Sequence, residues 1–139
     1  MIRGNIVDVL RREIFFGTVQ VENGRIQSIE RVKGTNDTYI LPGCVDAHVH
    51  VESSMLIPTE FARMAVVHGT VATVSDPHEI ANVLGAPSVQ YMIENGRQTP
   101  FKFYFGVPSC VPATDFETAG ARINAADVEE LLQHPEVRY

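Results

Sequence analysis

Apolar and polar residues alternate with a period of two in the first part of the chain. Three stretches with this alternation predict half-buried β-strands, over residues 5–9, 18–22 and 25–29. Asn23-Gly24 separates the last two stretches and favours the positive φ angles of a tight hairpin turn. Residues 34–38 have the composition of a loop. We therefore expect a small β element over residues 1–39 that ends at a domain boundary.

From residue 40 onward the pattern changes to strands that alternate with helices. The expected strands cover residues 40–50, 70–74 and 101–107, and a fourth begins at 137–139. The expected helices cover residues 58–68, 77–84, 88–94 and 126–133. Strand–helix–strand units of this length imply parallel strands with right-handed crossovers. No glycine-rich phosphate-binding loop follows any of these strands, which disfavours a Rossmann or P-loop domain.

The expected strand over residues 40–50 ends in two histidines, His48 and His50. On a strand these two side chains project to one side, roughly 6–7 Å apart, where two imidazoles can share one metal ion or flank a pair of ions. A single histidine on an ordinary strand would more often be structural. Here Asp46 lies two residues before His48, in a position for a carboxylate that orients a ligating histidine rather than binding the metal itself.

Other polar residues also collect just after the expected strands. Asp76, His78 and Glu79 follow the second strand of this part, and Ser109 and Cys110 follow the third. A (β/α) barrel has its chemistry at the carboxyl ends of its strands, so this convergence favours an enzyme. All five residues are candidates for the rim of an active site.

A structural explanation competes with that functional one for several of these side chains. Asp76 fits the N-cap of a helix whose first residue is Pro77, and Glu79 fits its capping-box partner, so we expect both carboxylates to cap. His78 is equally compatible with a contact to substrate or metal. For Cys110, a buried and inert thiol is the simpler expectation than a residue that lines a pocket.

Composition narrows the class of protein further. The chain has 139 residues, 45% hydrophobic and 20% charged, which are values of a globular domain with a real core. A net charge of −6 argues against a nucleic-acid partner. No signal peptide is expected, and no apolar run approaches the roughly 20 residues of a membrane span. The two cysteines, Cys44 and Cys110, form no CxxC pair, which fits a reducing cytoplasm.

Several longer strings carry a family resemblance. Residues 42–50, PGCVDAHVH, resemble the first barrel strand of the amidohydrolase superfamily, in which the HxH histidines bind a metal. Three further strings are similar to bacterial and archaeal adenine deaminases: VESSML at 51–56, HGTVATVSDPHEIANVLG at 68–85 and FGVPSCVPAT at 105–114. The resemblance extends from about residue 4 to the end of the chain.

The resemblance implies the N-terminal part of a TIM-type (β/α) barrel, over residues 40–139, preceded at 1–39 by strands of a small β-sandwich. It implies hydrolysis of adenine to hypoxanthine and ammonia with a mono- or binuclear centre of manganese or iron, zinc being an alternative. His48 and His50 would be ligands of that centre. Relatives are much longer and place their other ligands on later strands, so the chain is expected to be a fragment, inactive alone, of a cytoplasmic homo-oligomer.

Two alternatives to adenine deamination remain open on the sequence. The first is another cyclic amidohydrolase, similar to dihydroorotase or hydantoinase, which would share the HxH pair and the sandwich. The second is a truncated, non-catalytic product that folds through association, because a barrel cut after three strands exposes parallel edges and apolar helix faces.

Overall fold

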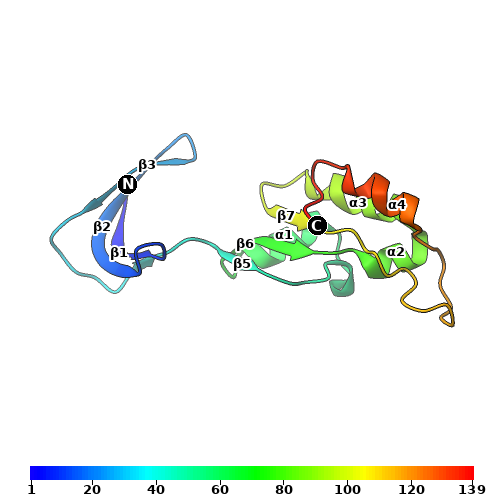
Figure 1. Ribbon diagram of the computed structural model, residues 1–139. Helices are drawn as coiled ribbons and strands as arrows, with labels where there is room; N and C mark the ends of the chain where they lie inside the picture. The colour runs from blue at the N-terminus through cyan, green and yellow to red at the C-terminus, as the bar shows by residue number, and fades with distance from the viewer. The chain divides into compact units, whose positions relative to one another are not determined.

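The computed structural model describes residues 1–139, which divide into two compact units, Met1–Pro42 and Gly43–Tyr139 (Figure 1). The first unit consists of β-strands, and the second combines parallel strands with helices. The chain is therefore a mixed α/β protein. No helix has both the length and the apolar character that a membrane crossing requires.

The first unit is a four-stranded sheet in the order β3-β2-β1-β4. Its strands are β1 (Ile2–Asp8), β2 (Glu13–Glu22), β3 (Arg25–Arg31) and β4 (Tyr39–Ile40). β1 and β3 pair antiparallel with β2, whereas β4 pairs parallel with β1. The three strands expected from the alternation are present, each longer than predicted because cross-strand pairing continues beyond the alternating residues.

The predicted hairpin turn connects β2 and β3. Asn23 has φ 51° and Gly24 has φ 72°, the pair of positive values that a tight two-residue hairpin requires. Glu22 pairs with Arg25 across this turn. Gly17 allows the backbone of β3 to approach closely, because a Cβ atom at this position would lie 2.6 Å from the carbonyl oxygen of Glu30.

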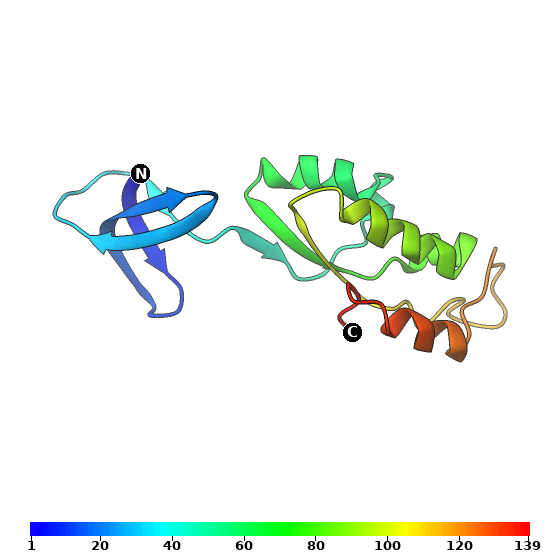
Figure 2. The ribbon, with the colours of Figure 1, turned by 90° about the horizontal axis from the view of Figure 1, so that it is seen from above.

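The second unit contains a three-stranded parallel sheet in the order β5-β6-β7. Its strands are β5 (Cys44–Asp46), β6 (Thr70–Ser75) and β7 (Lys102–Phe105). Its helices are the short 3-10 helix η1 (Glu52–Ser54), α1 (Pro58–Val66), α2 (His78–Leu84), α3 (Ala86–Gly96) and α4 (Ala125–Leu132). α1 and α3 contact each other and lie against β6 and β7 respectively (Figure 2).

The prediction of one strand over residues 40–50 was wrong. Ile40 belongs to β4 in the first unit, and Pro42-Gly43 separates it from β5, which ends at Asp46. The Asp46 carboxylate then accepts a hydrogen bond from the backbone N–H of His48 at 3.1 Å and turns the chain. The two histidines consequently follow the strand instead of lying on it.

The core of the second unit forms around β7. Phe105 is almost fully buried, its ring stacks on that of Phe103 with centroids 5.5 Å apart, and its backbone pairs in parallel with Val137. That pairing is the beginning of the expected fourth strand. Phe101 and Phe105, the two ends of the aromatic run 101–105, are both buried.

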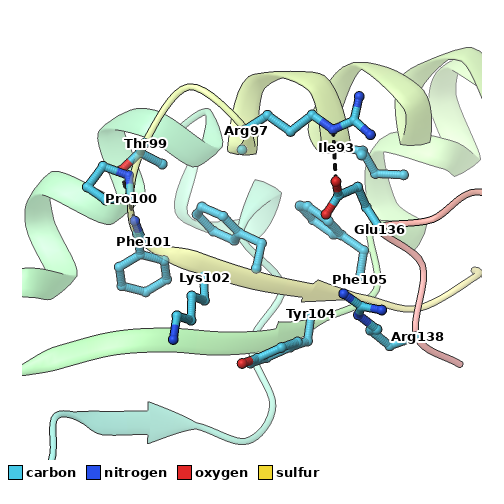
Figure 3. A pocket seen from close by; sticks show the side chains of 12 residues that line it. Ile93, Arg97, Thr99, Pro100, Phe101, Lys102, Tyr104, Phe105, Glu136 and Arg138 are labelled. Carbon is cyan, nitrogen blue, oxygen red and sulfur yellow. Dashed lines mark hydrogen bonds and ion pairs between the residues drawn. The ribbon is translucent and has the colours of Figure 1, made fainter. Parts of the chain in front are cut away.

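A separate hollow of about 390 Å³ runs along β7 (Figure 3). Lys102 and Tyr104 leave the strand on the side away from Arg97 and Glu136. Arg97 Nε lies 3.1 Å from Glu136 Oε1, which ties the end of α3 to the segment that follows α4. None of the histidines lines this hollow, and its ion pair has a structural role.

The capping box at the start of α4 offers a test of the fold. The Asn124 side chain accepts from the backbone N–H groups of Ala126 and Asp127, and Asp127 accepts from the N–H of Asn124. We expect Asn124→Ala to lower the free energy of unfolding by about 1 kcal/mol, because these helix-terminal donors lose their acceptor. Urea unfolding measures this loss. Glu129→Ala, at an exposed position within α4, should stay within about 0.5 kcal/mol of the wild type; an equal loss in both variants would contradict the capping argument.

Candidate metal centre

The imidazole rings of His48 and His50 converge. Their Nε2 atoms are 3.0 Å apart, and the rings meet edge to face with centroids 4.8 Å apart. The sequence argument expected a wider separation along a strand. The turn after Asp46 produces the close approach instead, so the two nitrogens face one point.

The surroundings of His50 determine which of its nitrogens is free. Its Nδ1 lies 3.1 Å from the backbone carbonyl oxygen of Asp76, which only accepts. Nδ1 therefore carries the proton, and the lone pair of neutral His50 is on Nε2, toward His48. Asp76 Oδ1, at 3.3 Å, and Glu79 Oε2, at 3.4 Å, lie near the same Nδ1. These contacts fix the ring in the orientation that a metal-binding histidine requires.

The prediction that Asp76 and Glu79 cap a helix was wrong. α2 begins at His78 after Pro77, and no side chain of its own sequence caps it locally. Asp76 Oδ1 instead accepts from Nδ1 of His78 at 2.7 Å, and Glu79 faces both His50 and His78. Both carboxylates are part of the histidine cluster, to which the sequence assigned them only as the second choice.

Glu52 supplies the missing cap of α2 from a distant part of the chain. Its Oε1 accepts from the backbone N–H of Glu79 at 3.1 Å. Burial and the nearby Glu79 carboxylate raise the pKa of Glu52 to about 7. Burial also favours neutral Glu79, but hydrogen bonds from Glu52 and Ser53 outweigh it and lower the pKa of Glu79. Glu79 is therefore the ionised member of this pair at neutral pH.

His78 lies beside the carboxylates of Asp76 and Glu79. Partial burial alone would lower its pKa, but the hydrogen bond to Asp76 and the charge of Glu79 outweigh burial and raise the pKa of His78. Its Nδ1–H donates to Asp76, and its Nε2 lies 3.8 Å from Glu79 Oε2. Its ring also packs edge to face on His50, with centroids 4.5 Å apart.

The remaining predicted residues lie at different distances from this cluster. Asp46 contacts the backbone of His48 and not an imidazole nitrogen, so its contact differs from the predicted orienting role. Cys110 is exposed, which corrects the expectation of a buried thiol. It lines a hollow of about 300 Å³ together with His78 and Glu79. Ser109 is also exposed and forms no side-chain hydrogen bond.

The donor set fits a divalent cation. Two nitrogens that each lie about 2.1 Å from one ion are separated by about 3 Å, which matches the Nε2 atoms of His48 and His50. Ligand atoms of His50, His78 and Glu79 also lie within 4.8 Å of one another. A neutral imidazole has one lone pair, so His50 serves one of these two groupings at a time. The buried Oε2 of Glu79, the ionised carboxylate of the pair, adds negative potential there.

Sequence reasoning missed two residues of the cluster, Glu52 and Ser53. Ser53 Oγ donates to Glu79 Oε1 at 2.6 Å, and Glu52 binds the backbone of the same residue. The available signals were their place in the VESSML string and their position directly after the His-Val-His motif, at the end of a predicted strand. Neither signal indicates a partner 26 or 27 residues away.

Comparison with known proteins adds independent information. The sequence profile of the amidohydrolase family matches residues 39–137. An adenine deaminase of Sulfurovum sp. is 63% identical over 137 residues, which are 99% of this chain and 26% of that protein. Adenine deaminases of Methanosarcina barkeri and Borreliella burgdorferi are 56% and 49% identical, each over 99% of this chain and 25% and 26% of their own length. The chain thus spans about a quarter of the length of the curated relatives it matches.

Proposed function

This chain belongs to the amidohydrolase family, and we propose that it is the N-terminal quarter of an enzyme that hydrolyses adenine to hypoxanthine and ammonia. One observation carries the proposal. The stretch that brings together His48, His50, Asp76 and Glu79 lies within a chain that is 63% identical to an adenine deaminase across 99% of its length.

We propose His48 and His50 as ligands of a divalent metal, with His78 and Glu79 beside them. When bound, such an ion lowers the pKa of water, so that hydroxide is available for hydrolysis at neutral pH. Manganese or iron is the proposed metal and zinc the alternative, because imidazole nitrogen and carboxylate oxygen suit all three.

The other residues of the cluster determine which nitrogen of His50 and His78 carries the proton, and how these two rings are oriented. The Asp76 carbonyl keeps the proton of His50 on Nδ1, and the Asp76 carboxylate does the same for His78. This arrangement leaves Nε2 of each ring free to accept. Glu79 remains ionised beside both rings and stabilises positive charge on His78, which makes His78 a candidate for holding a proton during the reaction.

For the whole protein we propose a TIM-type barrel that begins with β5, β6 and β7, preceded by β-sandwich strands in residues 1–39. Three parallel strands joined by helices support the barrel, because that topology places the polar residues after β5 and β6 at one edge of the sheet. We also propose a homo-oligomer in the cytoplasm with a small purine base as substrate. Two free, exposed cysteines, Cys44 and Cys110, suit a reducing compartment.

The whole protein should release ammonia from adenine. We expect stoichiometric ammonia and hypoxanthine after reconstitution with manganese or iron, and no ring opening of dihydroorotate or hydantoin. Coupled ammonia detection and chromatography of the purine products measure both reactions. Ring opening of a cyclic amide without action on adenine would replace the proposal with a cyclic amidohydrolase. Inactivity on both substrate classes in a metal-loaded, folded protein would favour a non-catalytic product.

A further inference from the structure

Two consecutive residues of η1 hold Glu79 by both its backbone and its side chain. Glu52 Oε1 accepts from the Glu79 backbone N–H at 3.1 Å, and Ser53 Oγ donates to Glu79 Oε1 at 2.6 Å. These bonds join η1 to the first turn of α2, which has no local side-chain cap. η1 and α2 also pack against each other. The position of Glu79 is therefore set from outside its own helix.

The bond from Ser53 determines where the second oxygen of Glu79 points. A carboxylate is planar, so fixing Oε1 and the backbone restricts Oε2 to a small region. That region lies 3.4 Å from His50 Nδ1 and 3.8 Å from His78 Nε2. Hydrogen bonds from a hydroxyl to a carboxylate are short and comparatively strong, and 2.6 Å is in their range. Without this bond, Glu79 is free to rotate away from both rings.

We propose that Ser53 is a positioning residue that holds the Glu79 carboxylate against His50 and His78. This role rests on the proposed function, because it matters only if the histidine cluster binds a metal. Carboxylates that orient ligating histidines tune metal affinity, and the loss of such a contact costs 10- to 100-fold in affinity or activity in other metal sites, by order of magnitude. Ser53 acts one step further from the metal, through Glu79.

The adjacent serine provides a matched control. Ser54 lies on the same short helix and is also exposed, but its hydroxyl donates to the backbone carbonyl of Val51 and does not contact Glu79. A purely structural role for η1 would make the two serines similarly important. Positioning of Glu79 requires Ser53 alone.

The experiment compares Ser53→Ala, Ser53→Thr and Ser54→Ala in the whole protein. We expect Ser53→Ala to weaken Mn²⁺ affinity about 10-fold and to lower kcat for adenine by a similar factor with KM changed less. Ser53→Thr keeps a hydroxyl and should restore both values to within about 3-fold. Ser54→Ala should match the wild type within about 2-fold. Melting temperatures should remain within about 3 °C, since exposed substitutions change stability little.

Equal losses in Ser53→Ala and Ser54→Ala, or wild-type Mn²⁺ affinity in Ser53→Ala, would overturn the positioning role. Failure of threonine to rescue would also contradict it. Metal affinity is measured without substrate, so the two proposals fail separately. If adenine is not deaminated but Ser53→Ala still weakens Mn²⁺ binding, only the proposed reaction is wrong. If adenine is deaminated and Ser53→Ala behaves as wild type, only the positioning role is wrong.

Discussion

His50→Ala is expected to lower kcat/KM for adenine at least about 1,000-fold in the whole protein and to remove most of the bound metal. His50 is the one side chain that belongs to both groups of possible ligands, the pair with His48 and the group with His78 and Glu79. A metal ion contributes several kcal/mol of transition-state stabilisation in hydrolases, and about 4 kcal/mol corresponds to a factor of 1,000. Elemental analysis and steady-state ammonia release measure the two effects.

His68, a histidine outside the cluster, provides a control for that experiment. His68 follows α1, is exposed, and contacts none of the cluster residues through its side chain. His68→Ala should retain the metal and keep kcat/KM within about 2-fold of the wild type. A His50→Ala protein that retains its full metal content would show that the metal binds elsewhere.

Phe105→Ala is expected to cost about 3–5 kcal/mol of unfolding free energy, the range found when a fully buried Phe is truncated. Phe105 is 1% exposed, and its ring stacks on Phe103 and approaches Gly96 of α3. Removal of the Phe105 ring leaves a cavity between β7 and the helices, because the surrounding side chains relax only partially into the space. Urea unfolding followed by tyrosine fluorescence reports on this unit, because three of the four tyrosines (Tyr91, Tyr104 and Tyr139) lie in it and the chain has no tryptophan.

The chain also contains a matched phenylalanine for this comparison. Phe116 is 95% exposed, so Phe116→Ala removes the same side chain without opening a cavity. We expect its unfolding free energy to stay within about 0.5 kcal/mol of the wild type. Similar losses for both variants would mean that β7 is not the centre of a packed core.

Local pattern was sufficient for most of the regular structure. Alternation identified the strands of the first unit, and Asn23-Gly24 identified their turn, because both signals depend on residues close in sequence. Pro58 marked the first residue of α1 in the same way, although α1 ends at Val66, two residues before the expected end. The prediction of one strand over residues 40–50 failed because the apolar run continues across Pro42-Gly43, where the chain passes from one sheet to another.

The candidate site was predicted only in part, for a related reason. The local rule for a capping box matched Asp76 and Glu79, but in the folded chain the Glu79 N–H bonds to Glu52, and both carboxylates have histidine partners. Local rules take no account of partners supplied by another segment. The histidines of the cluster, Asp76 and Glu79 could thus be anticipated as residues that follow strands, whereas Glu52, Ser53 and the hydrogen bonds of the cluster could not.

Every group of the histidine and carboxylate cluster, from His48 to Glu79, lies within roughly 30 consecutive residues, so its contacts span only the β5–α1–β6 unit and the start of α2. A ribosome adds roughly 5–20 residues per second, so these groups are all synthesised within a few seconds of one another. The two histidines and their acidic neighbours therefore leave the ribosome as one short stretch, before most of the residues that follow Glu79 are translated.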